Sequence, residues 1–216
     1  MTLNGCTAAI ENSPYTPDPY RNVAAPTVPL ACATNGELGQ LLTNPHQTRS
    51  PKASSDPTFN KAYCGGGNIQ GTTNLSAGVY VLSGGNWKVN SGAELNGGNV
   101  TLYLTNGATL DINGGATIDM SAPLSGPYAG LLVFFDRTNT GSSKINGGSN
   151  FSMVGAIYGA KQNIEFTGNT TGSGPGECTQ VIGYTVSMTG NSDFDTDCSN
   201  SGTTQILAGQ SIKVVG

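Results

Sequence analysis

Carboxylate side chains are the residues of this chain whose type and spacing could support catalysis. Asp111 and Asp119 occupy outward positions in two neighbouring segments, ATLDI and ATIDM, and Glu94, Asp136 and Glu165 lie in other segments of the same kind. Two carboxylates about 5–10 Å apart can cleave a glycosidic bond. Alternatively, an outward aspartate keeps a strand solvated and discourages unwanted pairing. Because no cluster of Arg or Lys stands nearby to hold an acidic sugar, we predict no catalytic residue and keep a carbohydrate-active enzyme as an alternative.

Nucleophilic catalysis has less support. The single histidine, His46, lies in the proline-rich stretch NPHQTRSP, and the chain has no GxSxG sequence. A serine or cysteine nucleophile usually needs a base beside it. The glycine-rich stretch CGGGNIQG lacks the Lys-Ser/Thr pair of a phosphate-binding loop. We therefore predict neither a histidine-based triad nor a nucleotide site.

The most acidic local stretch is NSDFDTDCSN, in which Asp193, Asp195 and Asp197 alternate. Their oxygens could wrap a calcium ion, which prefers carboxylate and carbonyl ligands. The stretch lacks the twelve-residue spacing of an EF-hand, and a solvated strand edge beside Cys198 is the alternative. Calcium is the one cofactor that the sequence suggests.

A second kind of site would be an outward polar surface. Thr101, Thr105, Thr109 and Thr117 could form a hydroxyl array that orders ice, although Tyr103, Asp111 and Asp119 interrupt it. Exposed aromatic rings, Tyr103 or Trp87, could instead stack on a sugar, and a core position is the alternative for Trp87. The predicted ligand-binding residues are Thr101, Tyr103, Asp111 and Asp119.

The cysteines favour disulfides over metal. The chain has five, Cys6, Cys32, Cys64, Cys178 and Cys198, and none forms a CxxC pair. A zinc site is therefore not predicted. We predict Cys178–Cys198 and Cys32–Cys64 bridges formed in an oxidising compartment, with Cys6 free or paired elsewhere. Buried free thiols are the alternative.

The elements that must position these residues are short strands. From about Gly71 onward, four- to seven-residue segments alternate apolar and polar side chains between Gly, Asn or Ser, as in GVYVL, NVTLYLTNG, LLVFFD and NIEFTG. Within residues 100–104, the alternation turns Leu102 inward and Thr101 and Tyr103 outward. No amphipathic helix separates these segments, so a βαβ fold is excluded. A sandwich or a solenoid remains.

A recurring Asn-Gly-Gly triplet decides between them. It stands at residues 96–98, 113–115 and 146–148, and looser versions follow, so the pattern recurs at about 17–23 residues, with the 33-residue interval close to two steps. Such recurrence suits the coils of a solenoid, whose bends require the positive φ that Gly and Asn tolerate. Asn-Gly hairpins in an antiparallel sandwich are the competitor. We predict an all-β, right-handed parallel β-helix, with SAPLSGPYAG (residues 121–130) as an excursion at a corner.

The first quarter of the chain reads differently. Eight of the eleven prolines of the chain fall at or before Pro57, and in this part only NGELGQLLTN suggests a short helix. We predict an irregular, proline-rich segment over residues 1–63, packed on a β-helix domain of residues 64–216, with residues 1–10 able to supply a first coil.

Composition excludes several partners. The net charge is −4 and only 10% of residues are charged, so there is no basic stripe for nucleic acid. No apolar run approaches the roughly 20 residues of a membrane span. The start, MTLNGCTAAIENS, lacks the basic and apolar regions of a signal peptide, so we expect the chain to be an excised or processed piece of an exported protein.

The amino-acid sequences of several longer segments are informative as well. LSAGVYVLSGGNWKVNSGAELNG, the run SAPLSGPYAGLLVFFDR and INGGSNFSMVGAIYGAKQNIEFTGN resemble the C-terminal region of TadG-like proteins of Flp/Tad pilus systems. The resemblance covers most of residues 64–216 and, more weakly, residues 1–63. It implies export and association with a pilus or the cell surface, and it supplies no catalytic residues.

Together these features predict a non-enzymatic, extracytoplasmic structural or adhesive module of a Tad/Flp-type pilus or cell surface. Its partners would be pilus or surface components or a glycan, and self-assembly is open. A carbohydrate-active β-helix enzyme and an ice- or glycan-binding solenoid are the alternatives.

Overall fold

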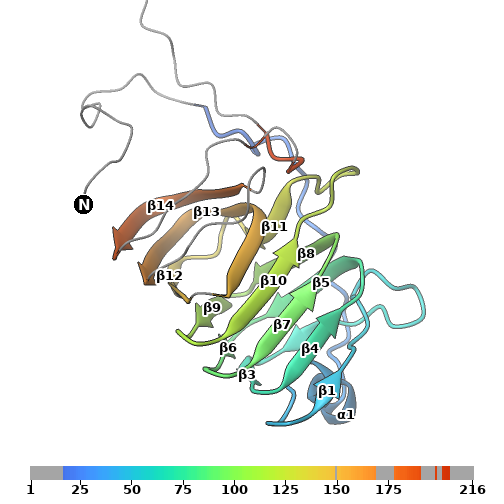
Figure 1. Cartoon of the computed structure of the whole chain (residues 1–216). Coiled ribbons are helices and arrows are strands. Elements are labelled where there is room, and N and C mark those ends of the chain that lie inside the picture. Colours follow the sequence, from blue (N-terminus) through green and yellow to red (C-terminus); the bar gives the residue numbers. More distant parts are fainter. Residues whose placement is uncertain (1–16, 149, 169–177, 191–197, 199–200, 205–216) are drawn as a thin grey trace, which may run out of the picture.

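Alternating segments with glycine-rich bends form a parallel β-solenoid (Figure 1). The computed structural model describes residues 17–148, 150–168, 178–190, 198 and 201–204. Every strand pairing in this part of the chain is parallel, and the strands make about six stacked coils. The predicted parallel β-helix is confirmed, and the antiparallel sandwich is excluded.

The strands lie on three faces of the solenoid. Face A consists of β1 (Thr48–Arg49), β4 (Thr72–Leu75), β7 (Glu94–Gly97), β10 (Thr117–Ser121) and the start of β13 (Phe151–Gly168). Face B consists of β2 (Tyr63–Cys64), β5 (Gly78–Ser83), β8 (Val100–Thr105), β11 (Leu131–Phe135), the middle of β13 and the first half of β14 (Thr179–Thr189). Face C consists of β3 (Gly67–Ile69), β6 (Asn86–Val89), β9 (Thr109–Ile112), β12 (Gly141–Gly147) and the ends of β13 and β14.

The length of one coil differs from the repeat length that the Asn-Gly-Gly triplets predict. Asn96 stacks on Asn74, 22 residues earlier, and Asn113 stacks on Asn90, 23 residues earlier. Asn96 therefore lies on face A and Asn113 at the end of face C of the same coil, so the 17 residues between them are not a repeat. The 33-residue interval is one coil, not two, since Lys144 lies opposite Asp111. The excursion at residues 121–130 lengthens this coil, as predicted.

Inward side chains of all three faces fill the interior. Three successive strands, each on a different face, contribute Leu102, Leu110 and Ile118, and each of these side chains is no more than 4% exposed. Each coil covers the apolar edge of the next, which is how a solenoid buries a core that no single coil could bury. The stack of inward residues is the main source of stability.

Glycine and asparagine make the corners, and they do so without closing hairpins. Gly85 has φ of 72°, and a Cβ there would lie 2.3 Å from the Gly65 oxygen of the neighbouring coil. Asn99 and Asn106 also adopt positive φ, of 57° and 55°. Only a residue that tolerates this conformation fits such corners.

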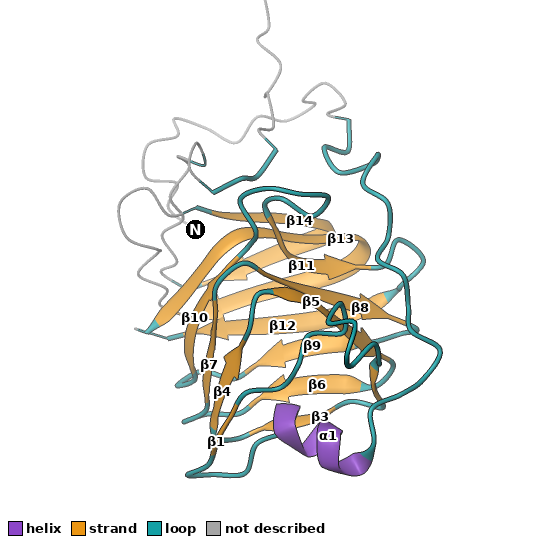
Figure 2. Cartoon of the chain, turned by 90° about the vertical axis from the view of Figure 1, so that its right-hand side faces the viewer, coloured by secondary structure: helices purple, strands orange, loops and turns teal. Residues whose placement is uncertain are grey.

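The short helix α1 (Asn35–Leu41) lies at the end of the stack opposite β14 (Figure 2). Thr34 and Glu37 form a capping box, in which each side chain satisfies a backbone N–H of the other residue. Hydrogen bonds from Lys61 and Thr34 lower the pKa of Glu37 to about 2. Leu41 is buried, so the helix covers the apolar end of the first coils.

The N-terminal region covers face B and also contributes to the solenoid. Residues 17–23 and 50–62 form loops that contact this face, and Figure 2 shows loops on the side of β5, β8 and β11. Ser54 and Ser55 accept hydrogen bonds from the Val81 and Val79 amides, at 2.9 and 3.0 Å. Because β1 already pairs with β4, the solenoid begins before the predicted boundary at residue 64. Residues 1–10, expected to supply a first coil, lie outside the described residues.

Both predicted disulfides are present. Cys32–Cys64 joins the N-terminal region to β2, with Cα atoms 5.7 Å apart, and Cys178–Cys198 joins residues flanking β14. Cys6 lies outside the described residues. Within the described part, no helix is long and apolar enough to cross a membrane.

Candidate interaction surfaces

Outward side chains of face A form polar columns along the stack. Asn96 donates to Asn74 at 3.0 Å, and Asp119 continues the column one coil further on. In the neighbouring column, Thr72 donates to Glu94 at 3.0 Å. Since these residues repeat at the spacing of adjacent strands, about 4.8 Å, the face presents amides, hydroxyls and carboxylates in rows.

Face C carries a charged column. Lys88, Asp111, Lys144 and Glu165 stand opposite one another on consecutive strands. Asp111 accepts hydrogen bonds from the Asn86 side chain at 2.8 Å and from the Lys144 amide at 3.2 Å. Lys144 forms an ion pair with Glu165 at 3.0 Å. The face is thus regular, polar and alternately charged.

Thr101 and Tyr103 are not on an exposed surface, which corrects the prediction made for them. They point away from the interior, but Thr101 is 0% and Tyr103 1% exposed. Thr101 donates to the Leu131 carbonyl at 2.8 Å, and the Tyr103 hydroxyl donates to Asp136. Burial, with this contact, raises the pKa of Tyr103. Both side chains are structural.

The signal that reveals this burial is the composition of β11. Its five residues, LLVFF, are all apolar and all buried, and a continuous apolar strand is typical of a sheet covered on both sides. Phe134 and its neighbours on face B thus indicate a second, outer core. The ring of Phe134 lies 5.3 Å from that of Tyr103 and 5.5 Å from that of Tyr158.

This outer core is closed by the N-terminal segment. Tyr20 is 1% exposed and stacks edge-on against Tyr158 at 5.6 Å. Arg137 lies 5.4 Å from the centre of the Phe134 ring and donates to the Tyr20 carbonyl. Asp18 accepts a hydrogen bond from the Tyr158 hydroxyl at 2.7 Å. These contacts involve residues that the sequence did not single out.

Asp111 and Asp119 remain accessible but do not form a pair. Asp111 is half-buried on β9 of face C, whereas Asp119 is exposed on β10 of face A. The neighbours of Asp119 are Asn96 and Ser152. Adjacent strands in the sequence lie on different faces of a solenoid, so their outward residues diverge. The two carboxylates cannot act together on one bond.

Two further predictions concern the calcium ligands and Trp87. Asp193, Asp195 and Asp197, the candidate calcium ligands, lie outside the described residues. Among the residues that the structure describes, no group of three His, Cys, Asp or Glu side chains could hold a metal ion. Trp87 is 1% exposed and belongs to the inner core.

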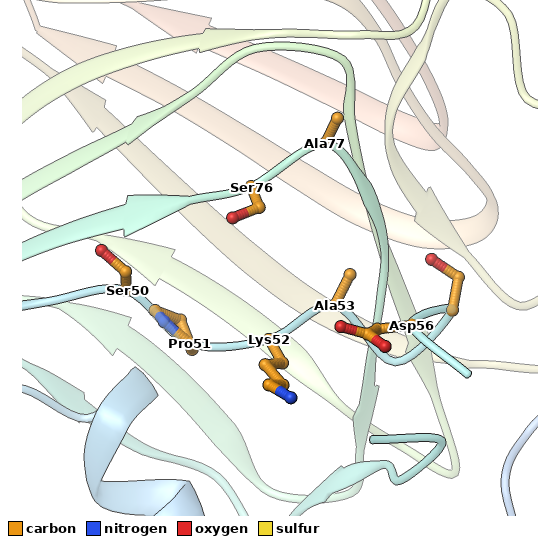
Figure 3. Close-up of a pocket in the computed structure, with 8 residues that line it drawn as sticks. Ser50, Pro51, Lys52, Ala53, Asp56, Ser76 and Ala77 are labelled. Atoms are coloured by element: carbon orange, nitrogen blue, oxygen red, sulfur yellow. The ribbon is translucent and has the colours of Figure 1, made fainter. Parts of the chain in front are cut away.

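Two shallow grooves add concave surface beside face A. One, of about 330 Å³, lies between residues 50–56 and the bend at Ser76 and Ala77 (Figure 3). Lys52 lines it and donates to Thr58 at 2.9 Å. The other, of about 380 Å³, includes His46, Thr72 and Glu94. Both are lined mainly by polar groups and lie next to the columns of face A.

Comparisons with protein families, curated proteins and solved structures give no match for this chain.

Proposed function

We propose that this protein is a non-enzymatic structural or adhesive module that acts outside the cytoplasm, at a pilus of the Tad/Flp type or elsewhere on the cell surface. The observation that carries the proposal is the pair of polar faces, A and C, which no other segment within the described residues covers. Their amides, hydroxyls and carboxylates recur in register along the stack, as the Asn74–Asn96 hydrogen bond illustrates.

Such a surface suits broad, polar contact. A chain with 10% charged residues offers amides and hydroxyls that can hydrogen-bond to a sugar or to another protein surface. The two disulfides favour an oxidising compartment. The link to a pilus comes from the resemblance of the sequence to TadG-like proteins, and it is the part of the proposal that binding experiments must establish.

The placement of the carboxylates favours binding over catalysis. Asp111 and Asp119 lie on different faces, Asp136 accepts from Tyr103 and Thr138, and Glu165 pairs with Lys144. Glu94 shares face A with Asp119, and it accepts a hydrogen bond from Thr72. A glycosidase needs two carboxyl groups on either side of one bond. The ice-binding alternative loses its threonine array, because Thr101 and Thr105 are buried.

A glycan array and binding to isolated pili test the proposal. We expect retention without turnover, and loss of binding when Asn74, Asn96 and Asp119 of face A are all replaced by Ala. The corresponding replacement of Asn86, Asn163 and Thr185 on face C by Ala tests the second polar face, and retention of binding by this variant assigns the binding to face A. Release of reducing ends from a polysaccharide, abolished by Asp119→Asn, would instead establish an enzyme. Absence of binding to every glycan and to pili would refute the adhesive role.

A further inference from the structure

The charges on face C alternate in sign along the stacking direction. Lys88, Asp111, Lys144 and Glu165 follow one another on β6, β9, β12 and β13, and the column ends in neutral residues, Asn68 before it and Ser187 after it. The order of charges is plus, minus, plus, minus. Read from the other end, the same column has the opposite sign at every position.

Face C is also open. Lys88 and Lys144 are exposed, Asp111 and Glu165 are half-buried, and no segment of the described chain packs over them. The side chains of the Lys144–Glu165 ion pair are 53% and 42% exposed, so both retain surface for a second partner. The flanking columns are neutral: Asn86 lies opposite Thr109, and Asn163 opposite Thr185.

We propose that face C is the interface of a weak, two-fold symmetric dimer of this chain. In a symmetric dimer the same patch meets itself. Two orientations of the axis bring the flat faces together with the strands of the two copies aligned. An axis parallel to the strands reverses the order of the coils, so Lys88 meets Glu165 of the second copy and Asp111 meets Lys144. An axis along the stack places each charge against its own copy. The charge pattern selects the first.

The size of the face sets the strength of the dimer. The strands of face C have three to seven residues. At about 3.3 Å per residue, and with six strands about 4.8 Å apart, they give a face of roughly 15 by 25 Å. Two copies would bury roughly 750 Å² in total, which is in the range of weak, transient interfaces and below that of stable complexes. Exposed ion pairs contribute little each and are screened by salt. The dimer should therefore form at high protein concentration and low ionic strength.

The same column could instead serve only the monomer, by pairing charges between its own coils. The two roles separate in experiment, because an internal role changes thermal stability, whereas an interface changes the molecular mass in solution. The dimer is also independent of glycan or pilus binding, so failure of one leaves the other standing.

Sedimentation equilibrium of the intact chain tests the dimer, at about 0.02 M and about 0.5 M salt, where the screening length falls severalfold. We expect a concentration-dependent dimer that dissociates at high salt. Lys144→Glu makes the column plus, minus, minus, minus, and should weaken association at least about tenfold. Arg21→Glu, an exposed residue of the N-terminal segment with the same change in charge, should leave association unchanged.

Exchanging two charges within the column gives the most specific test of the dimer. The double variant Asp111→Lys with Lys144→Asp changes the order of charges in the column to plus, plus, minus, minus. When the order of the coils is reversed in the second copy, every charge again faces one of opposite sign. We expect it to recover the dimer, with circular dichroism confirming that each variant is folded. A monomer at every concentration, association insensitive to Lys144→Glu, or failure of the exchange to recover the dimer would overturn the proposal.

Discussion

Faces B and C are built from the same coils, yet their outward sides differ in kind. On face B the outward column is Val81, Tyr103, Phe134 and Tyr158, and every member is at most 1% exposed. On face C the corresponding column is charged and open to solvent. The alternation within each strand determines which side chains point outward. Whether another segment of the chain covers these side chains depends on whether they are apolar or charged.

The largest test of this contrast removes one ring from the covered side. We expect Phe134→Ala to lower the free energy of unfolding by about 3–5 kcal/mol, the usual cost of emptying a core position, although Phe134 points away from the solenoid interior. Urea unfolding followed by circular dichroism measures it. Lys144→Ala is the control from face C, with an expected loss of at most about 1 kcal/mol. Equal effects of the two variants would contradict the outer core.

The second test loosens the segment that covers face B. Replacing Cys32 and Cys64 together by Ser removes a bridge that closes 32 residues of chain and should cost roughly 2–4 kcal/mol. Limited proteolysis should then cut within residues 17–62 sooner than in the parent protein. Unchanged cleavage would show that side-chain contacts alone, such as those of Tyr20, hold the segment.

The third test uses pH. Burial, followed by the contact with Asp18, raises the pKa of Tyr158 to about 12, and burial raises that of Tyr80 to about 12. The folded state thus favours the neutral phenols. Their contribution is fully present below the ordinary tyrosine pKa of about 10 and is lost as the pH rises toward about 12. Thermal unfolding at increasing pH should show the loss, and Tyr158→Phe should reduce it. A stability that stays constant from pH 9 to about 12 would contradict the burial.

The smallest expected effect lies on face A. Asn96→Ala removes one hydrogen bond to Asn74 in a polar column, and we expect a loss of about 0.5–1.5 kcal/mol in unfolding free energy. Asn163→Ala on face C is the matched comparison, since Asn163 accepts one hydrogen bond from Thr185. A loss above about 3 kcal/mol at either site would show that these columns contribute substantially to the stability of the fold.

The sequence was sufficient for the fold, because a solenoid repeats one local rule. Alternation and glycine-rich bends predict parallel coils, and the disulfides Cys32–Cys64 and Cys178–Cys198 are confirmed. The repeat length was wrong for Asn96 and Asn113, since similar triplets occur at two different corners of one coil. Sequence spacing alone cannot tell a corner from a full turn.

The site was less predictable, for a reason that Thr101 and Tyr103 illustrate. Alternation gives the direction of each side chain, but it does not say which distant segment lies over it. On the same face, Tyr158 is covered by Tyr20, which stands 138 residues earlier in the chain. Likewise, the separation of Asp111 from Asp119 follows from the corner between β9 and β10, which rotates neighbouring strands onto different faces.

The lengthened coil at residues 121–130 has a consequence for how such a molecule can change. Its additional residues leave at a corner and return at Gly130, whose amide bonds to the Pro123 carbonyl at 2.7 Å. The preceding strand β10 stays in register with β7 and β13, whereas the pairing of β11 with β13 shifts between Leu131 and Val133. Leu124, 64% exposed, stands at its tip. Because residues 124–127 of this excursion are exposed, we expect this corner to accept grafted foreign peptides for display more readily than the corners that join paired strands.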